Sequence, residues 1–273
     1  MVTQAEKGLA FRALHQRSYA FIIPNPWDIG SARLLAGFGF EALATTSAGY
    51  AFSLGRRDNA VTREETIAHA AAIAAATDLP VSVDLENGFG DAPETCAETI
   101  RLAAAAGAVG GSIEDASNRA GDPIYELSQA VERLHAAAEA ARALPFTFTL
   151  TARAENYLHG RPDLDDTIQR LQAYRKAGAN VLFAPGLTDK EDLAAVVAAV
   201  AAPVNFLAGL QGVALTLADL SALGVKRISV GSALTRAAFG AFLRAAEEMR
   251  EYGTFKFADE AISFADLSGK FPE

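Results

Sequence analysis

Two acidic residues, Asp84 and Glu86, stand one residue apart where an apolar run that begins at Val81 ends in a glycine-containing turn. Side chains at positions i and i+2 of a strand point to the same side, so these two carboxylates can converge on one point. Carboxylates brought together repel each other unless a cation or a shared proton lies between them. Mg²⁺ is the natural cation because it prefers oxygen ligands and keeps several water molecules. The alternative interpretation is a surface turn whose acids are solvated.

Other polar residues follow other apolar runs of the chain in the same way. They are Ser47 after the second run, Asp58 further along the same loop, Glu114 after the fourth run, Arg153 after the fifth, Asn205 in the seventh and Ser229 in the eighth. If the runs are parallel strands, acids at the ends of the third and fourth strands lie beside an arginine from the fifth. Such a group would form a cup that binds a metal ion and a carboxylate.

The apolar runs alternate with segments whose apolar residues have helical spacing. The predicted strands are 20–24, 42–46, 81–85, 109–113, 146–151, 180–184, 204–208 and 227–230. The predicted helices are 3–17, 29–38, 63–77, 92–106, 124–143, 164–177, 189–200, 216–223 and 233–250. Such alternation indicates right-handed crossovers and a parallel sheet.

Eight strand–helix units in about 250 residues have the size of a closed (β/α)₈ TIM-type barrel. No linker or low-complexity tract divides the 273 residues. We therefore expect one α/β barrel domain over residues 1–273, with an N-terminal helix and a C-terminal helical extension. An open doubly wound sheet is the alternative fold. The active site of a barrel lies at the carboxyl ends of its strands, where the polar residues named above are placed.

Composition excludes several classes of function. The net charge of −9 and the absence of basic patches argue against nucleic-acid binding. The longest apolar run, residues 193–204, contains Pro203 and is too short to cross a bilayer. The first residues lack the apolar stretch of a secretory signal, and the single cysteine, Cys96, cannot form an internal disulfide. We expect a cytoplasmic protein that binds neither nucleic acid nor membrane.

The order and spacing of the motifs resemble those of the isocitrate lyase/phosphoenolpyruvate mutase superfamily over residues 20–245. The resemblance is carried by Asn25-Pro26-Trp27-Asp28, Ser47 through Asp58, Asp84 through Gly90, Ile113-Glu114-Asp115 and Thr151-Ala152-Arg153. It implies a barrel with a swapped eighth helix that assembles as a homodimer or homotetramer. It also implies Mg²⁺, or Mn²⁺ in its place, and cleavage of a C–C or P–C bond next to a 2-oxo acid or its enolate.

The resemblance further implies roles for individual residues. Asp84 would be the closest metal ligand, and three carboxylates would hold the metal mostly through its water molecules: Glu86, Glu114 and Asp58. A substrate carboxylate would lie against Ser47, Ala48 and Gly49, with Arg153 as its cationic partner. The implied catalytic residues are Ser47, Asp58, Glu114 and Arg153, and Asn205 is a further candidate for binding substrate.

Two features depart from the family pattern. Glu86 stands where the family usually has Asp, and Phe89 where it usually has Tyr. The loop at residues 116–123 lacks the Lys-Lys/Arg-Cys-Gly-His segment of isocitrate and methylisocitrate lyases, so orthodox isocitrate cleavage is not expected. We expect a mobile loop there, in which Asn118 and Arg119 meet a distal carboxylate or phosphoryl group on closure. Solvated loop residues are the alternative.

These observations predict a Mg²⁺-dependent lyase that cleaves a C–C bond next to a 2-oxo or 2-hydroxy carboxylate through an enolate. Oxaloacetate decarboxylase and dimethylmalate or methylisocitrate lyase are the models for this activity. One alternative is a phosphonopyruvate-type mutase or hydrolase that acts on a P–C bond. Another is an inert barrel that binds a 2-oxo acid without turnover. A Schiff-base aldolase is disfavoured because no lysine ends a predicted strand.

Overall fold

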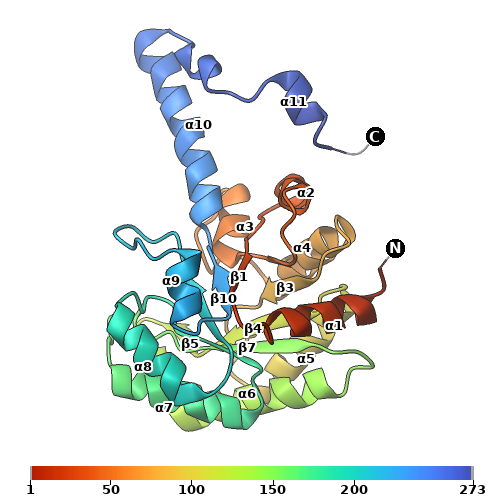
Figure 1. Ribbon diagram of the computed structural model, residues 1–273, viewed down its shortest axis with the longest axis vertical. Helices are drawn as coiled ribbons and strands as arrows, with labels where there is room; N and C mark the ends of the chain where they lie inside the picture. Colours follow the sequence, from red (N-terminus) through yellow and green to blue (C-terminus); the bar gives the residue numbers. More distant parts are fainter. Residues whose placement is uncertain (1, 272–273) are drawn as a thin grey trace.

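The computed structural model describes residues 2–271 and contains a ring of eight parallel strands with helices outside it (Figure 1). The order around the sheet is β1-β10-β9-β8-β7-β4-β3-β2. The strands are β1 Phe21–Ile23, β2 Leu43–Ala44, β3 Val81–Asp84, β4 Gly110–Glu114, β7 Thr149–Arg153, β8 Val181–Phe183, β9 Val204–Leu207 and β10 Arg227–Ser229. Each one lies in or overlaps a predicted apolar run, and the (β/α)₈ barrel is confirmed.

The ring is closed between β1 and β2 by a few bonds rather than by a full strand ladder. The backbone N–H of Ala44 donates to the carbonyl of Pro24 at 3.1 Å. The side-chain amide of Asn25 donates to the Thr45 carbonyl at 3.0 Å and accepts from the Val230 N–H at 2.8 Å. One buried asparagine therefore ties together the ends of β1, β2 and β10.

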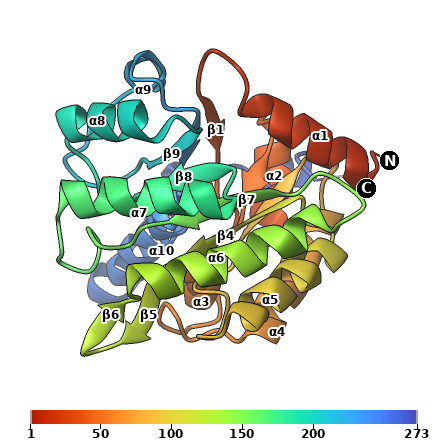
Figure 2. The ribbon, with the colours of Figure 1, turned by 90° about the horizontal axis from the view of Figure 1, so that it is seen from below.

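The helices between the strands lie where the apolar spacing predicted them. They are α2 Ile29–Gly37, α4 Arg63–Ala75, α5 Pro93–Ala105, α6 Leu127–Arg142, α7 Leu164–Ala177, α8 Lys190–Val200 and α9 Leu217–Ala222. From α5 to α8 each helix packs beside the next around the outside of the barrel (Figure 2). They bury small side chains, mostly alanines, against the strands and against one another.

Short elements that the sequence did not predict follow two of the strands. The helix α3 Ser47–Ser53 begins directly after β2, because the Thr46 side chain accepts a hydrogen bond from the Gly49 N–H and caps its first turn. The hairpin of β5 Ala116–Arg119 and β6 Asp122–Ile124 occupies the segment where a mobile loop was expected. Both elements are at the carboxyl ends of the strands.

The first helix, α1 Gln4–Leu14, closes the other end of the barrel. Its Phe11 is fully buried and reaches into the ring of strands at Gly110. A Cβ atom at Gly110 would lie 2.8 Å from the Phe11 ring, so only glycine fits there. His15 follows the helix, is buried, and bonds the Phe11 carbonyl through Nδ1 at 2.8 Å.

The buried His15 ring makes stability depend on pH. Burial and the charge of Arg227 lower the pKa of His15 to about 3. Below pH 6.5 the His15 imidazole is therefore protonated in the unfolded chain but stays neutral in the folded chain. The free energy of unfolding falls as the pH falls below about 6.5. Between pH 7.5 and 5 the wild type should lose about 2 kcal/mol of unfolding free energy relative to His15→Leu. Urea denaturation of both proteins at pH 7.5 and 5 tests this, and a constant difference would contradict it.

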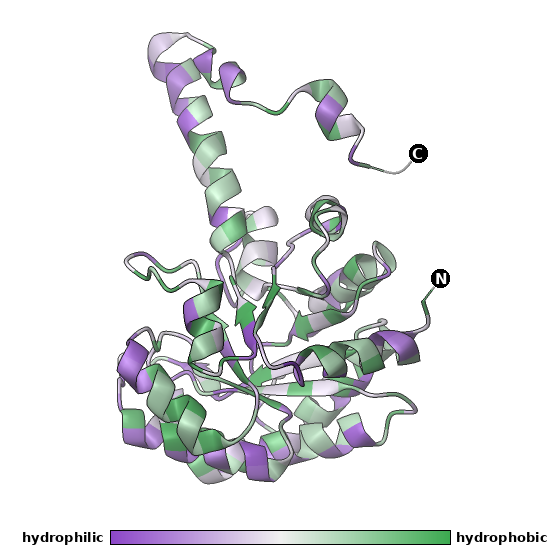
Figure 3. Cartoon of the chain, in the orientation of Figure 1, coloured by the Kyte–Doolittle hydropathy of each residue, from purple (hydrophilic) through white to green (hydrophobic). Residues whose placement is uncertain are grey.

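The helix α10 Ala233–Tyr252 projects away from the barrel (Figure 1). Hydrophobic residues run along it (Figure 3), yet within this helix only Thr235 is buried. Phe242 and Leu243 are 69% and 56% exposed. The chain continues through the short helices η1 Lys256–Asp259 and α11 Phe264–Ser268. None of the helices within residues 2–271 is long and apolar enough to cross a membrane.

Candidate active site

Arg153, at the end of β7, lies at the centre of an acidic cluster. Its three guanidinium nitrogens each meet a different carboxylate: Nε is 2.8 Å from Glu155, Nη1 2.9 Å from Asp84, and Nη2 3.1 Å from Glu114. Burial lowers the pKa of Arg153, but the three negative charges outweigh this and raise it well above the ordinary value. The arginine therefore remains charged and holds the ends of β3, β4 and β7 together.

Asp84, the last residue of β3, is held on its other side by α3. Its Oδ2 accepts hydrogen bonds from the Ser47 N–H at 3.2 Å and the Ser47 hydroxyl at 2.9 Å. The N–H is available because the first residues of a helix have no intrahelical acceptor. The Ser112 hydroxyl lies 3.4 Å from Oδ1. Asp84 is thus fixed in orientation at the point where three strand ends meet.

With Glu86 and Glu114, the cluster contains more carboxyl groups than the single charge of Arg153 can balance. Glu86 is only 5% exposed, adopts φ of 48°, and its Oε1 is buried without a hydrogen-bond partner. Burial, followed by the charges of Asp84 and Asp58, raises the pKa of Glu86 to about 8. Burial also raises the pKa of Glu114 well above its ordinary value, against the attraction of Arg153. The cluster is therefore suited to accept a further cation or protons.

The donor set fits a magnesium ion. Every donor is an oxygen, and the unpartnered Oε1 of Glu86 is an acceptor without a cation. Within residues 2–271 no three acidic, histidine or cysteine side chains are close enough to hold a metal directly. Mg²⁺ commonly takes one or two protein carboxylates and keeps several water molecules. Asp84 is the best-placed direct ligand, because it lines the central cavity and is held in orientation by Ser47 and Arg153.

The central cavity, about 210 Å³ in volume, opens at the carboxyl ends of the strands. Several predicted site residues line it: Ser47, Ala48, Asp58, Asp84, Arg153, Asn205 and Ser229. Asp58 is exposed at the mouth, where partial burial and the neighbouring Asp84 charge raise its pKa. Gly49 does not line the cavity, because its N–H donates to the Thr46 side chain that caps α3, and it packs under the α10 residue Thr235.

Asn118 and Arg119 lie in the β5–β6 hairpin and do not line the cavity. Arg119 Nη1 is 3.2 Å from an Asp91 oxygen, and its guanidinium lies 5.4 Å from the centre of the Tyr125 ring. The Tyr125 hydroxyl donates to Asp91 at 2.5 Å. The hairpin is therefore fastened to the turn after β3, and its contact with a ligand stays a prediction.

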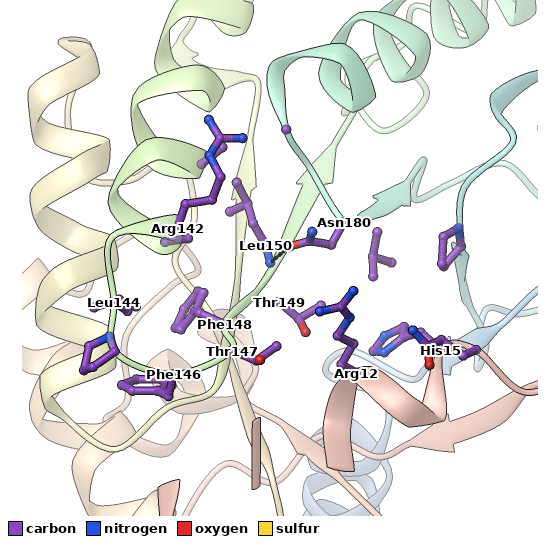
Figure 4. A pocket seen from close by; sticks show the side chains of 17 residues that line it. Arg12, His15, Arg142, Leu144, Phe146, Thr147, Phe148, Thr149, Leu150 and Asn180 are labelled. Carbon is purple, nitrogen blue, oxygen red and sulfur yellow. Dashed lines mark hydrogen bonds between the residues drawn. The ribbon is translucent and has the colours of Figure 1, made fainter. Parts of the chain in front are cut away.

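A second, larger cavity of about 740 Å³ lies at the opposite end of the barrel (Figure 4). It is formed by α1 and by the segments that lead into β7 and β8. Its charged lining residues are Arg12 and Arg142, and no carboxylate of the described residues 2–271 lines it. The acidic cluster and the polar strand ends are all at the smaller cavity. We therefore place the candidate active site there, despite its size.

Sequence reasoning missed one charged residue of this cavity. Arg227, the first residue of β10, is 5% exposed and lines the cavity beside Asn205 and Ser229. Its Nε donates to Asn205 Oδ1 at 2.8 Å, and the Asn205 amide donates to the Ser229 hydroxyl at 2.9 Å. The feature of the sequence that could have indicated it is a charged residue at the start of the eighth apolar run. A charged residue at such a position usually marks the polar edge of a strand.

Comparisons with known proteins agree with this geometry. The family model described as phosphoenolpyruvate phosphomutase matches residues 11–250. Oxaloacetate decarboxylase of Bradyrhizobium sp. strain BTAi1 is 31% identical over 211 residues, which is 75% of this chain and 70% of the relative.

Solved structures show the same relationship. A Burkholderia cenocepacia J2315 protein whose lyase/mutase description is provisional shares 67% identity, with a TM-score of 0.96 over 97% of this chain and 95% of that one. The structure of 2,3-dimethylmalate lyase, a member of the phosphoenolpyruvate mutase/isocitrate lyase superfamily, has a TM-score of 0.87 at 26% identity, over 99% and 95% of the two chains.

A more distant neighbour shares the fold. Phosphonopyruvate hydrolase, solved in complex with oxalate and Mg²⁺, superposes with a TM-score of 0.85 at 23% identity, over 98% of this chain and 95% of that one. Because the family model covers most of the chain and the barrel carries the family's strand-end motifs, this protein belongs to the phosphoenolpyruvate phosphomutase family of the isocitrate lyase/phosphoenolpyruvate mutase superfamily.

Proposed function

We propose that this protein is a Mg²⁺-dependent carbon–carbon lyase for a small 2-oxo or 2-hydroxy dicarboxylate, such as oxaloacetate or an alkylmalate. The observation that carries the proposal is the position of Asp84, which is fixed by Ser47 and Arg153 at the cavity while Glu86 behind it lacks a partner. The kinship with an oxaloacetate decarboxylase and a dimethylmalate lyase supports the substrate class.

The residues fit the demands of this chemistry. Breaking the bond beside the oxo or hydroxy carbon leaves an electron pair that must be stored as an enolate or an equivalent anion. When bound, Mg²⁺ would act as a Lewis acid toward the oxygen on which that charge develops. Asp84 would hold the ion directly, with Glu86, Glu114 and Asp58 bonded to its water. Ser47 and Ala48 would position the substrate carboxylate at the start of α3.

Arg153 has a structural part in this proposal as well as an electrostatic one. Each of its nitrogens already meets a carboxylate, so it keeps Asp84 and Glu114 in place before any ligand arrives. Such preorganisation means that little of the site must rearrange as charge develops in the transition state. A contact between Arg153 and a substrate carboxylate remains part of the proposal.

A substrate panel tests the function. Pyruvate release from oxaloacetate and 2,3-dimethylmalate, with coupled detection, is compared with phosphate release from phosphonopyruvate, each with Mg²⁺ and with EDTA. Oxaloacetate also decays in solution with metal, so protein carrying Asp84→Asn is the control. We expect EDTA-sensitive pyruvate release. Phosphate release alone would identify a phosphonopyruvate-type enzyme, and binding without turnover of any substrate would identify an inert barrel.

We also propose that α10 packs against another copy of the chain to form a homodimer or homotetramer. Its exposed apolar side chains find no cover on its own barrel, and surfaces of this kind mark association sites. Phe242→Asp should therefore shift the protein to a smaller species in sedimentation velocity at micromolar concentration. Leu9→Asp, at an exposed position of α1, is the matched control and should not. A monomeric wild type would contradict the proposal.

A further inference from the structure

The described residues include three buried arginines, and two of them are well compensated: Arg133 and Arg170. Arg170 Nη1 is 3.1 Å from Asp115 and its Nε is 2.8 Å from Asp166. Arg133 donates to backbone carbonyls, including Gly90 at 3.1 Å, and its guanidinium lies 4.0 Å from the centre of the Tyr125 ring. Arg153, slightly less buried, meets three carboxylates. Each of these cations has acceptors or an aromatic face around it.

Arg227 is the exception. Among residues 2–271 its side chain makes one hydrogen bond, from Nε to the neutral Asn205 side chain, and its buried Nη1 has no partner. It forms no ion pair within residues 2–271, and burial alone lowers its pKa to about 9, so it stays charged at neutral pH. A buried charge without a counter-charge is strongly destabilising. The interior of such a barrel is usually filled by branched apolar side chains, which would avoid this penalty.

The position of Arg227 allows its charge to bind an anionic ligand. It lines the same cavity as Asp84 and Arg153, but it comes from the first residue of β10 and so lies deeper than Ser229. Asn205 holds Nε, and the buried Nη1 has no hydrogen-bond partner among residues 2–271, so the donors on the outer side of the guanidinium are not used by the chain itself. Two parallel N–H donors of a guanidinium match the two oxygens of a carboxylate. At about 210 Å³ the cavity is smaller than pockets for drug-sized ligands, and it suits a small acid.

We infer that Arg227, oriented by Asn205, forms an anion subsite deep in the cavity that binds a carboxylate group. The group bound there is the second carboxylate of a dicarboxylate substrate. This assignment rests on the proposed function. One ligand would then meet the Asp84–Ser47 end with its 2-oxo acid group and Arg227 with its distal carboxylate. This subsite selects for dicarboxylates and against monocarboxylates such as pyruvate.

The test measures binding and not turnover, so it stands even if the proposed lyase activity fails. Calorimetry in metal-free buffer compares malonate, succinate, pyruvate and formate on the wild type and on Arg227→Met and Arg227→Lys. We expect at least one dicarboxylate to bind the wild type and to lose tenfold or more in affinity in Arg227→Met, with Arg227→Lys in between. Pyruvate affinity should change less than threefold.

Two further variants distinguish a loss of binding from a loss of stability. Asn205→Asp places a carboxylate against Arg227 within the chain, and should raise the melting temperature while weakening dicarboxylate binding by tenfold or more. Arg170→Met removes a compensated buried arginine and should lower the melting temperature, whereas Arg227→Met should not lower it in anion-free buffer.

The same measurements distinguish a carboxylate of the substrate from a separate small anion as the group that Arg227 binds. In one outcome formate binds the wild type but not Arg227→Met, while the affinities for dicarboxylates and pyruvate do not change. This outcome would support the subsite and would show that it binds a separate small anion. Unchanged affinity of every probe in Arg227→Met and Asn205→Asp would overturn the subsite. A lower melting temperature of Arg227→Met in anion-free buffer would overturn it as well, because it would make the arginine a stabilising part of the core.

Discussion

Replacement of Asp84 by asparagine is expected to lower metal-dependent kcat/KM by about 10³-fold or more. A Lewis-acid ion contributes several kcal/mol to transition-state stabilisation, and each ~1.4 kcal/mol is a factor of ten. The variant keeps the shape of the side chain and can still bond Ser47, so the barrel should fold. Asp84 is also the candidate ligand that lines the cavity and touches both Ser47 and Arg153.

The measurement combines steady-state kinetics over a Mg²⁺ titration with circular dichroism. Asp91→Asn is the matched control, because Asp91 is an exposed acid that pairs with Arg119 at the hairpin. It should keep activity within a few-fold of the wild type. If Asp84→Asn kept wild-type activity and the same response to EDTA, the assignment of Asp84 as a metal ligand would be wrong. Glu86→Asp should be milder than Asp84→Asn, since it keeps a carboxylate at position 86.

Arg153→Met should remove about 3–5 kcal/mol of unfolding free energy, which is the usual effect of leaving a buried charge unpaired. Three carboxylates lose their shared cation in this variant: Asp84, Glu114 and Glu155. Burial already raises the pKa of Glu114 and of Glu155 above the ordinary value. Without the guanidinium both pKa values should rise further.

The pH dependence of that loss has a definite sign. A carboxyl group whose pKa is raised by folding holds a proton that the unfolded chain releases, so stability falls as pH rises above about 4.5. The deficit of Arg153→Met should therefore be larger at pH 8 than at pH 5.5. Urea denaturation at both values measures it, with Arg56→Met as control, because the exposed pair of Arg56 and Glu65 contributes little. A deficit that shrinks with rising pH would contradict this account.

The sequence by itself determined the barrel and the polar strand ends. Eight apolar runs alternated with helical segments, and this local periodicity depends only on which face of each element is buried. Because the carboxyl ends of parallel strands share one face of a barrel, the sequence alone predicts that Asp84, Glu114 and Arg153 lie together. The structure brings these three within direct contact.

Short elements could not be predicted from local pattern. The helix α3 has seven residues and rests on one capping bond from Thr46, too little to leave a periodic signal. The hairpin at 116–124 carries polar residues that resemble a loop, but Asp91 from another turn fastens it through Arg119 and Tyr125. Long-range contacts decide such segments, and local propensity is only a weak guide to them.

The tertiary structure alone decided how the charges are balanced. Sequence placed Arg153 near a substrate carboxylate, but the fold surrounds it with three carboxylates of the chain itself. The burial of Arg227 without a counter-charge from residues 2–271 could not be predicted, because nothing near it in the sequence distinguishes it from an arginine at a strand edge. Whether a charge is paired depends on which residues distant in sequence surround it, and only the folded barrel determines that.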